Sequence, residues 1–208
     1  MELAPALLGL RLVRESAEGR SGGLIVETEA YGGPADRASH ARAGRTRRTA
    51  PMFGPAGHAY VYLVYGLHSC LNVVAEEEGV AGAVLIRAVR PVLGLDLIRA
   101  RRGRPGGIDP VLAAGPARVC QALAIDRSLD GHDLTHGEAL WIEHPGEKER
   151  ETLLSSGLVA GPRVGIAYAG DGWAERPWRF GVWADPSLSR SFPAASRPLP
   201  STSPPPRR

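Results

Sequence analysis

The chain has 208 residues, 43% of them hydrophobic and 23% charged, which is enough for one ordinary globular domain with its own core. No stretch approaches the roughly 20 consecutive apolar residues of a membrane-spanning helix, and Glu2 stands where a signal peptide would carry basic residues. These features exclude an integral membrane protein and predict a soluble, cytoplasmic one. Cys70 and Cys120 show no metal-binding or redox spacing, so we expect two buried thiols.

The charge is unevenly distributed along the chain. Residues 184–208 contain four arginines and one aspartate, which account for the whole formal net charge of +3. Residues 36–48 contain five arginines and a single acidic residue, Asp36. Such a patch could contact DNA phosphates, and a solvated arginine-rich loop would have the same composition. Charge alone therefore leaves both interpretations open.

The first predicted elements are a helix, a strand and a hairpin. Leucines recur with helical spacing between residues 3 and 13, which predicts a helix there. A glycine pair, Gly22 and Gly23, precedes a strand that opens at Leu24. Two β-rich runs at 58–65 and 67–74 then predict a hairpin whose tip is near Tyr65 and Gly66.

The second half of the chain is predicted to mix strands with short helices. A strand at 83–89 is expected to end at Pro91, and Gly115 with Pro116 introduces a helix. The predicted helices of this half lie at 93–101 and 117–124, and its further strands at 139–143, 164–168 and 180–183.

Strands that succeed one another without regular βαβ alternation predict a mixed α+β fold. We expect a single domain at residues 1–183, built on a curved, mainly antiparallel β-sheet with flanking helices and a protruding β-hairpin. Residues 184–208 hold seven of the 18 prolines and, from Phe192 onward, little except Pro, Ser, Ala and Arg. This composition predicts a disordered tail.

Two acidic residues and a tyrosine alternate along the first predicted strand. Glu27, Glu29 and Tyr31 have the period of two that directs all three side chains to one face. A polar face of this kind is most often solvent-exposed. A strand end beside a basic loop that contains His40 is also where active sites tend to lie. The pattern by itself favours the solvent-exposed face.

Three of the five tyrosines, Tyr60, Tyr62 and Tyr65, fall within six residues at the predicted hairpin. Aromatic side chains near a hairpin tip can stack on bases or enter a DNA groove. The alternative is that they are ordinary strand aromatics that cover the core. The hairpin is therefore a candidate nucleic-acid contact.

Longer motifs favour the functional interpretation. They begin with Val26-Glu27-Thr28-Glu29-Ala30-Tyr31 and continue through His40, Arg42, Arg45, Tyr60-Val61-Tyr62, Tyr65-Gly66, Asn72, Val84-Leu85-Ile86-Arg87-Ala88, Gly115-Pro116 and Arg163-Val164-Gly165-Ile166. Over nearly all of residues 5–183 the chain resembles the alkyladenine (3-methyladenine) DNA glycosylase family. The resemblance implies an enzyme of base-excision repair that flips a damaged purine out of duplex DNA and hydrolyses its N-glycosidic bond.

The resemblance also implies a role for each matched position. Glu29 takes the position of the general base that activates water. Tyr65 matches the side chain that fills the gap left by the flipped nucleotide. Pocket positions are matched by Tyr31, His40, Tyr62, Asn72 and Leu85, and DNA-contacting or pocket-flanking positions by Arg42, Arg45 and Arg87. The implied substrates are 3-methyladenine and 7-methylguanine, with hypoxanthine and ethenoadenine as further candidates.

The chemistry agrees with these roles. A purine alkylated at N3 or N7 is cationic and already a good leaving group, so a single carboxylate can suffice. Such a base also stacks well on tyrosine rings. Lys148 is the only lysine and lies in a charged run remote from every motif, so a Schiff-base lyase step has no evident amine apart from the N-terminus. We expect a monofunctional, monomeric enzyme without metal or organic cofactor that acts on double-stranded DNA containing alkylated or deaminated purines, nucleoid-associated while it does so.

Two other functions compete with this one. The first is a non-catalytic damaged-DNA-binding protein on the same fold. The second is a metal hydrolase that uses Glu27, Glu29, His40 and His58, for which no recognised ligand spacing is present.

Overall fold

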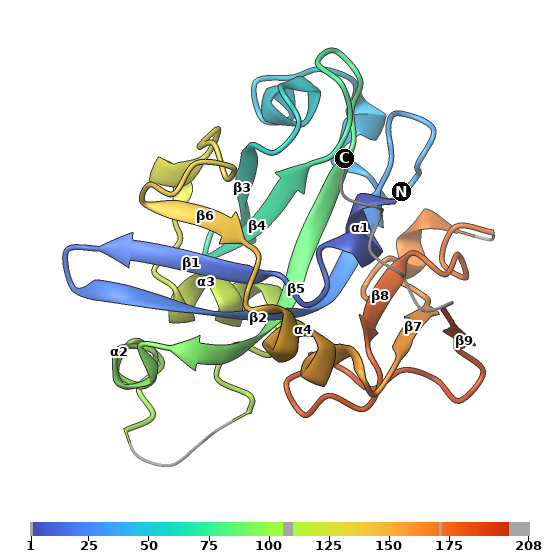
Figure 1. Cartoon of the computed structure of the whole chain (residues 1–208). Coiled ribbons are helices and arrows are strands. Elements are labelled where there is room, and N and C mark those ends of the chain that lie inside the picture. The colour runs from blue at the N-terminus through green and yellow to red at the C-terminus, as the bar shows by residue number, and fades with distance from the viewer. Residues whose placement is uncertain (1, 106–109, 171, 200–208) are drawn as a thin grey trace, which may run out of the picture.

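The computed structural model describes residues 2–105, 110–170 and 172–199. Within them, nine strands form one sheet in which every pairing is antiparallel, in the order β3-β4-β5-β2-β8-β7-β9, with β1 between β2 and β6 on a branch (Figure 1). This confirms the predicted α+β fold on an antiparallel sheet. The strands are β1 (Arg11–Ser16), β2 (Gly19–Tyr31), β3 (Ala59–Val64), β4 (His68–Val74), β5 (Ala83–Leu93), β6 (Leu140–Glu143), β7 (Leu158–Gly161), β8 (Arg179–Val182) and β9 (Arg197–Pro198).

The helices are short and few. Pro116 stands in the first turn of α3, where its missing N–H is no loss, and Gly115 precedes it with φ +131°. The predicted helices of the second half are thus present with shifted ends. The α-helices are α1 (Leu3–Ala6), α2 (Leu95–Arg101), α3 (Pro116–Ala122) and α4 (Glu147–Leu154), and the 3₁₀ helices are η1 (His40–Ala43), η2 (Ala50–Phe53), η3 (Arg127–Leu129) and η4 (Ala167–Ala169).

The N-terminal helix is shorter than predicted. It ends at Ala6, and Gly9 then takes the left-handed conformation with φ +79° before β1 begins at Arg11. The leucines that suggested a continuous helix are divided between the helix, the turn and the strand. Leu7, Leu8 and Leu12 are all buried nevertheless. The helical spacing of the leucines therefore arises because residues from a short helix and from a strand are buried in the same core.

The two central strands run through the residues that were predicted to end or precede them. Gly22 and Gly23 lie inside β2, and Pro91 pairs with Gly23 inside β5 at an irregular register. A Cβ at Gly23 would overlap the carbonyl oxygen of Arg90, so only glycine allows the neighbouring strand to approach this closely. The glycine pair thus marks a place where neighbouring strands pack closely. Pro91 is tolerated inside β5 because the strand pairing is irregular at this point.

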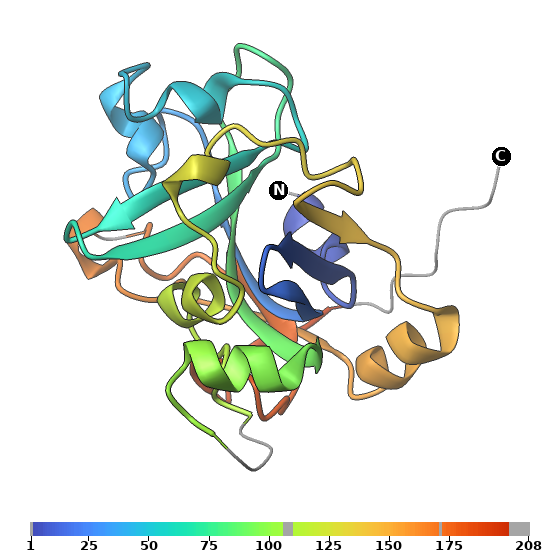
Figure 2. The ribbon, with the colours of Figure 1, turned by 90° about the vertical axis from the view of Figure 1, so that its left-hand side faces the viewer.

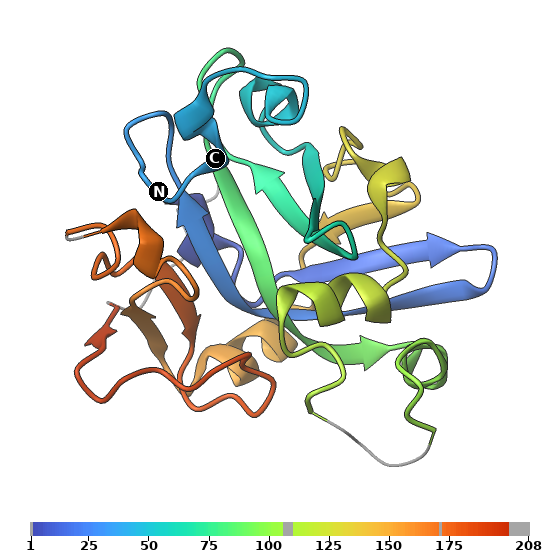
Figure 3. The same ribbon diagram turned by 180° about the vertical axis from the view of Figure 1, so that it is seen from behind.

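One face of the central strands joins the main core. Val61, Leu71 and Ile86 are buried there together with Val119 and Cys120 of α3. Figure 3 shows α3 lying across the strands, and it contacts β4, β5 and α2. Cys70 and Cys120 are both free and buried, as predicted. The opposite face carries the polar side chains described below.

The β3–β4 hairpin has the predicted position and projects from the body (Figure 2). Its turn contains Tyr65 at φ +53° and Gly66 at φ +70°, and the Leu67 N–H donates to the Val64 carbonyl at 3.0 Å. Positive φ at both central residues is the arrangement that suits the twist of a hairpin. Tyr65 is 92% exposed. Because the Tyr65 side chain is almost fully exposed and its backbone has an unfavourable conformation, packing within the fold does not explain an aromatic residue at this position.

Two predictions for the last third of the chain are wrong. Residues 164–168 do not form a strand, because Gly165 has φ +76° and η4 follows, whereas β7 was not foreseen. Residues 184–199 also differ from the predicted disordered tail, since Asp185, Ser187 and Phe192 are buried and β9 pairs with β7. The expected boundary after residue 183 therefore needs correction, and residues 200–208 lie outside the described part of the chain.

Candidate active site

The register of five strands brings the predicted site residues onto one face of the sheet. Directly opposed residues project to the same side, and the pairings run from β3 through β4, β5 and β2 to β8. The resulting row is Tyr60, Asn72, Leu85, Glu29 and Arg179. Glu27 and Tyr31 flank Glu29 on the same face. The face is buried, so the solvent-exposed alternative for the two glutamates is wrong.

Glu29 is fully buried and receives three hydrogen bonds. The Tyr31 hydroxyl donates to Oε2 at 2.8 Å, Arg87 Nη1 donates to the same oxygen at 3.3 Å, and the Val164 N–H donates to Oε1 at 2.6 Å. All three partners are donors, as an ionised carboxylate requires. Burial, followed by the charge of Glu29, raises the pKa of Tyr31 well above its ordinary value, so the hydroxyl keeps its proton.

Arg87 lies in the interior and not on the surface where a DNA phosphate would meet it. Its exposed fraction is 7%, and it donates to Glu29, to Glu27 Oε1 at 3.1 Å and to Ser189 Oγ at 3.0 Å. Burial would lower the pKa of Arg87, but Glu29 and Glu27 raise it above its usual value. The prediction that Arg87 contacts DNA therefore needs correction. Its buried guanidinium instead donates a hydrogen bond to the Glu29 carboxylate.

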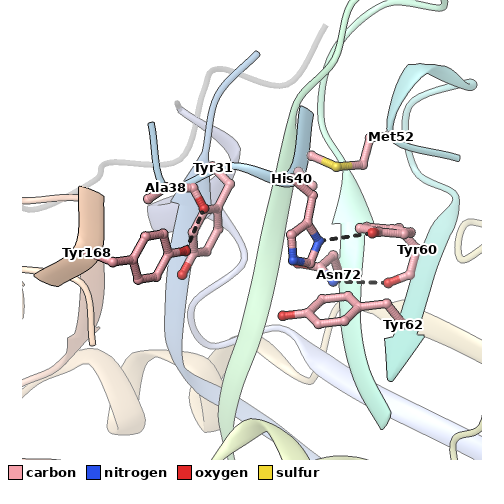
Figure 4. A pocket seen from close by; sticks show the side chains of 9 residues that line it. Tyr31, Ala38, His40, Met52, Tyr60, Tyr62, Asn72 and Tyr168 are labelled. Carbon is pink, nitrogen blue, oxygen red and sulfur yellow. Dashed lines mark hydrogen bonds between the residues drawn. The ribbon is translucent and has the colours of Figure 1, made fainter. Parts of the chain in front are cut away.

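A hollow lies between β2 and the β3–β4 hairpin (Figure 4), and it is lined by Tyr31, whose hydroxyl binds the Glu29 carboxylate. It holds about 370 Å³ of space, part of it open to solvent. Of the predicted pocket residues, Leu85 is buried in β5 outside this lining. The lining residues are Tyr31, Ala38, His40, Met52, Tyr60, Tyr62, Asn72, Ala83 and Tyr168.

Polar groups in the hollow are held in fixed orientations. His40 Nδ1 lies 3.0 Å from the Tyr60 hydroxyl, and the His40 ring meets Tyr62 edge to face with 4.5 Å between centroids. Asn72 Nδ2 donates to the Tyr60 carbonyl at 3.0 Å. The second nitrogen of His40 and the rest of the Asn72 amide can then serve a molecule in the hollow. Two tyrosine rings, Tyr31 and Tyr62, stand on opposite sides of the space in Figure 4.

His40 is expected to be neutral at pH 7. Burial, and secondarily the charge of Arg48, lowers its pKa below the ordinary 6.5. Because the unfolded chain then binds protons that the folded chain does not, His40 makes the protein less stable as the pH falls through about 6.5. NMR titration of the imidazoles should give His40 a midpoint below 6.5, and Arg48→Gln should raise it. A midpoint at or above 6.5 in the wild type would contradict this description of the pocket.

Several residues of the site escaped the sequence prediction. Tyr168 is 71% exposed at the mouth of the hollow, where its hydroxyl donates to the Ala38 carbonyl at 3.3 Å. Val164 contributes only its backbone N–H, so no side-chain pattern could have revealed it. Met52 and Ala83 look like core residues in sequence and belong to a small buried cluster beneath the hollow. The tyrosine count around Tyr60 was the one usable signal.

The arginine-rich loop borders the hollow. Arg42 lies on the same 3₁₀ helix as His40, and both Arg42 and Arg45 are exposed. Arg37 and Arg47 are exposed as well. None of these four arginines has a carboxylate partner within the described ranges. Arg48 is also exposed and lies over the Tyr62 ring at 5.6 Å. The loop thus presents unneutralised positive charge next to the cavity.

The geometry bears on two of the other predictions. In the part of the chain that the structure describes, no group of three or more His, Cys, Asp or Glu side chains is arranged to hold a metal ion. The metal-hydrolase alternative built on Glu27, Glu29, His40 and His58 therefore has no support. Over the same residues, no helix is long and apolar enough to cross a membrane.

Comparison with known proteins decides the family. A family model described as Methylpurine-DNA glycosylase (MPG) matches residues 1–186. The chain belongs to this family. It is 47% identical over 195 residues to a protein of Anaeromyxobacter dehalogenans (strain 2CP-1) provisionally named 3-methyladenine DNA glycosylase, which covers 93% of this chain and 82% of that protein.

Two eukaryotic relatives of this family are similarly close. The DNA-3-methyladenine glycosylase of Mus musculus is 44% identical over 197 residues, covering 90% of this chain and 57% of the mouse protein. That of Arabidopsis thaliana is 45% identical over 189 residues, covering 91% of this chain and 70% of the plant protein. The predicted family and enzyme class are confirmed: the protein is a DNA glycosylase, a hydrolase of N-glycosyl bonds that acts in DNA repair on damaged DNA.

Proposed function

We propose that the protein is a monofunctional 3-methyladenine DNA glycosylase that flips alkylated purines into the hollow and hydrolyses their N-glycosidic bond with a water activated by Glu29. The observation that carries this proposal is the buried Glu29 carboxylate, held by three donors, one of which is the hydroxyl of Tyr31 in the wall of an aromatic hollow beside the basic loop. The relatives named for 3-methyladenine support the substrate. 7-Methylguanine, hypoxanthine and ethenoadenine are further candidates.

The hollow suits a cationic purine. Tyr31 and Tyr62 offer electron-rich faces on which such a base can stack, while His40 and Asn72 offer polar atoms to its edge. An alkylated purine departs readily, so the pocket needs no strong acid, and a neutral His40 is compatible with that chemistry. Outside the hollow, Arg42 and Arg45 are the proposed phosphate contacts, because both are exposed without a carboxylate partner in the described chain.

Water is the proposed nucleophile because no lysine lies near the hollow. Lys148 is exposed on α4, whose next two residues contact Arg11 and the Leu8 carbonyl at the N-terminal part of the fold. A Schiff base with the deoxyribose would need an amine within reach of C1′. Glu29 would take a proton from water as the oxygen attacks C1′, the C1′–N bond breaks and the base departs. The products are the free base and an abasic site.

Tyr65 is the proposed wedge that replaces the flipped nucleotide. Stacking of an aromatic ring on a base is worth about 1–3 kcal/mol, so Tyr65→Gly should lower the affinity for lesion DNA by roughly 5- to 150-fold. Stability should stay within about 1 kcal/mol of the wild type, since relief of the positive φ offsets the added chain entropy of glycine. Tyr65→Phe is the matched control and should bind normally. Unchanged lesion affinity in Tyr65→Gly would exclude the wedge role.

A product assay distinguishes this enzyme from a protein that only binds damage. Duplex DNA methylated on its purines is incubated with the protein, and the released material is separated by chromatography, with a gel-shift measurement on the same DNA. We expect free 3-methyladenine, no borohydride-trapped covalent complex and full activity in EDTA. Tight lesion binding without base release would favour the non-catalytic DNA-binding protein instead.

A further inference from the structure

The proposed reaction uses Glu29 and leaves the second buried carboxylate of the same strand face without a role. Glu27 is 0% exposed. Its Oε1 accepts from Arg87 Nε at 3.1 Å, from Arg179 Nη1 at 3.1 Å and from Ser189 Oγ at 2.9 Å, and its Oε2 accepts from the Ser189 N–H at 2.6 Å. Burying a charge costs desolvation free energy, so the presence of a second buried carboxylate at this position needs an explanation.

Glu27 and Ser189 hold Arg87 in one orientation. The guanidinium is planar, and each of its three nitrogens points to a different partner: Nε to Glu27, Nη1 to Glu29 and Nη2 to Ser189 Oγ. Ser189 belongs to the segment after β8 that was expected to be disordered. That segment is fastened by the Asp185 pair with Arg90 and by Arg179, which donates to the carbonyls of residues 190 and 191.

Glu27 also sets the charge that Glu29 experiences. Groups facing Glu29 are Arg87 of β5, Arg179 of β8, Tyr31 of its own strand, Tyr62 of β3 and the Val164 N–H. Facing Glu27 are Arg87, Arg179 and Ser189. Two carboxylates therefore share two guanidinium groups. Without Glu27, both arginines would act on Glu29 alone, and a carboxylate bound more tightly by positive charge is a weaker base.

We propose that Glu27, anchored by Ser189 of the C-terminal segment, is a positioning residue for the reaction: it orients Arg87 and takes up enough of the positive charge around it for Glu29 to act as a base. This inference rests on the proposed function for its kinetic consequence. It makes Ser189 of the C-terminal segment part of the active site.

The test compares Glu27→Gln and Ser189→Ala with the wild type in single-turnover release of 3-methyladenine from saturating lesion duplex, measured from pH 4.5 to 8.5. Misplacing a reacting group by about 1 Å can lower a rate by about 100-fold, so a loss of about 10- to 100-fold is expected for Glu27→Gln at the plateau. The acid limb of the pH–rate profile of Glu27→Gln should move to lower pH. Ser189→Ala, which keeps the backbone donor, should show a smaller loss. Lesion affinity should not change in either.

Ser191→Ala is the matched control, because Ser191 is exposed in the same segment and contributes only its carbonyl oxygen. A variant that is merely less stable would lose amplitude in proportion to its unfolded fraction and keep the wild-type pH profile. Wild-type rates and pH profiles in both Glu27→Gln and Ser189→Ala would overturn the proposal.

A second readout does not depend on activity. The ¹³C resonance of the Glu29 carboxyl, assigned with Glu29→Gln, is titrated in wild type and Glu27→Gln. A lower midpoint in Glu27→Gln supports the proposal, and an unchanged midpoint with an unchanged Arg87 Nε–H signal contradicts it. If the wild type releases no base, the proposed function fails, while this titration still decides whether Glu27 governs the charge at Glu29.

Discussion

Asp36→Ala is expected to lower the free energy of unfolding by about 3–5 kcal/mol, because it would leave a buried guanidinium without its counter-charge. Arg163 Nη1 and Nη2 donate to the two Asp36 oxygens at 2.6 and 3.0 Å, and both side chains are at most 1% exposed. Asp36 also accepts from the backbone of Gly32 and Ala38. The loss therefore affects the turn that leads from β2 to the basic loop.

The pH dependence of this pair has a defined sign. Burial would raise the pKa of Asp36, but the hydrogen bonds from Arg163, Gly32 and Ala38 outweigh it and lower the pKa. The pair therefore stabilises the fold fully above the unfolded pKa of about 3.9 and loses this effect as the pH falls further. Urea unfolding at pH 7 gives the comparison, with Asp96→Ala as the matched control. Asp96 is 98% exposed in its pair with Arg99 and should contribute less than about 1 kcal/mol. Equal losses in the two variants would contradict this account.

Glu29→Gln is expected to lower the single-turnover rate of base release by about 10²–10⁴-fold, the usual contribution of a general base. The amide keeps the shape of the side chain but cannot take a proton from water. Lesion binding should persist, because the hollow and the basic loop do not depend on the Glu29 charge. Some loss of stability is expected, since the new amide N–H group would face Arg87 Nη1. Circular dichroism at the assay temperature verifies that the variant is folded.

The sequence predicted the strand face of the site correctly and its burial incorrectly. Period-two spacing is a local property, so it placed Glu27, Glu29 and Tyr31 on one face without further knowledge. Their burial depends on partners 58 to 162 residues away, namely Arg87, Val164, Arg179 and Ser189. Pairing over such distances follows from strand register, which a single sequence does not reveal.

The same reason accounts for the errors in the fold. Gly22 and Gly23 have the composition of a turn, and only the approach of β1 and β5 on either side shows that they belong to a strand. The segment after β8 has the composition of a disordered tail. It is ordered by a few specific contacts, with Phe192 lying over the Arg179 guanidinium at 3.8 Å and Ser189 binding Glu27. Composition averages over residues and therefore overlooks such anchors.

The role of Glu29 is tested by single-turnover base release from one methylated duplex by wild type and Glu29→Gln, at protein concentrations that saturate both, with the released base identified by chromatography. We expect the wild type to release 3-methyladenine and leave abasic DNA, while folded Glu29→Gln binds the same duplex and releases the base at least about 100-fold more slowly. Release by Glu29→Gln at the wild-type rate would show that Glu29 is not the base.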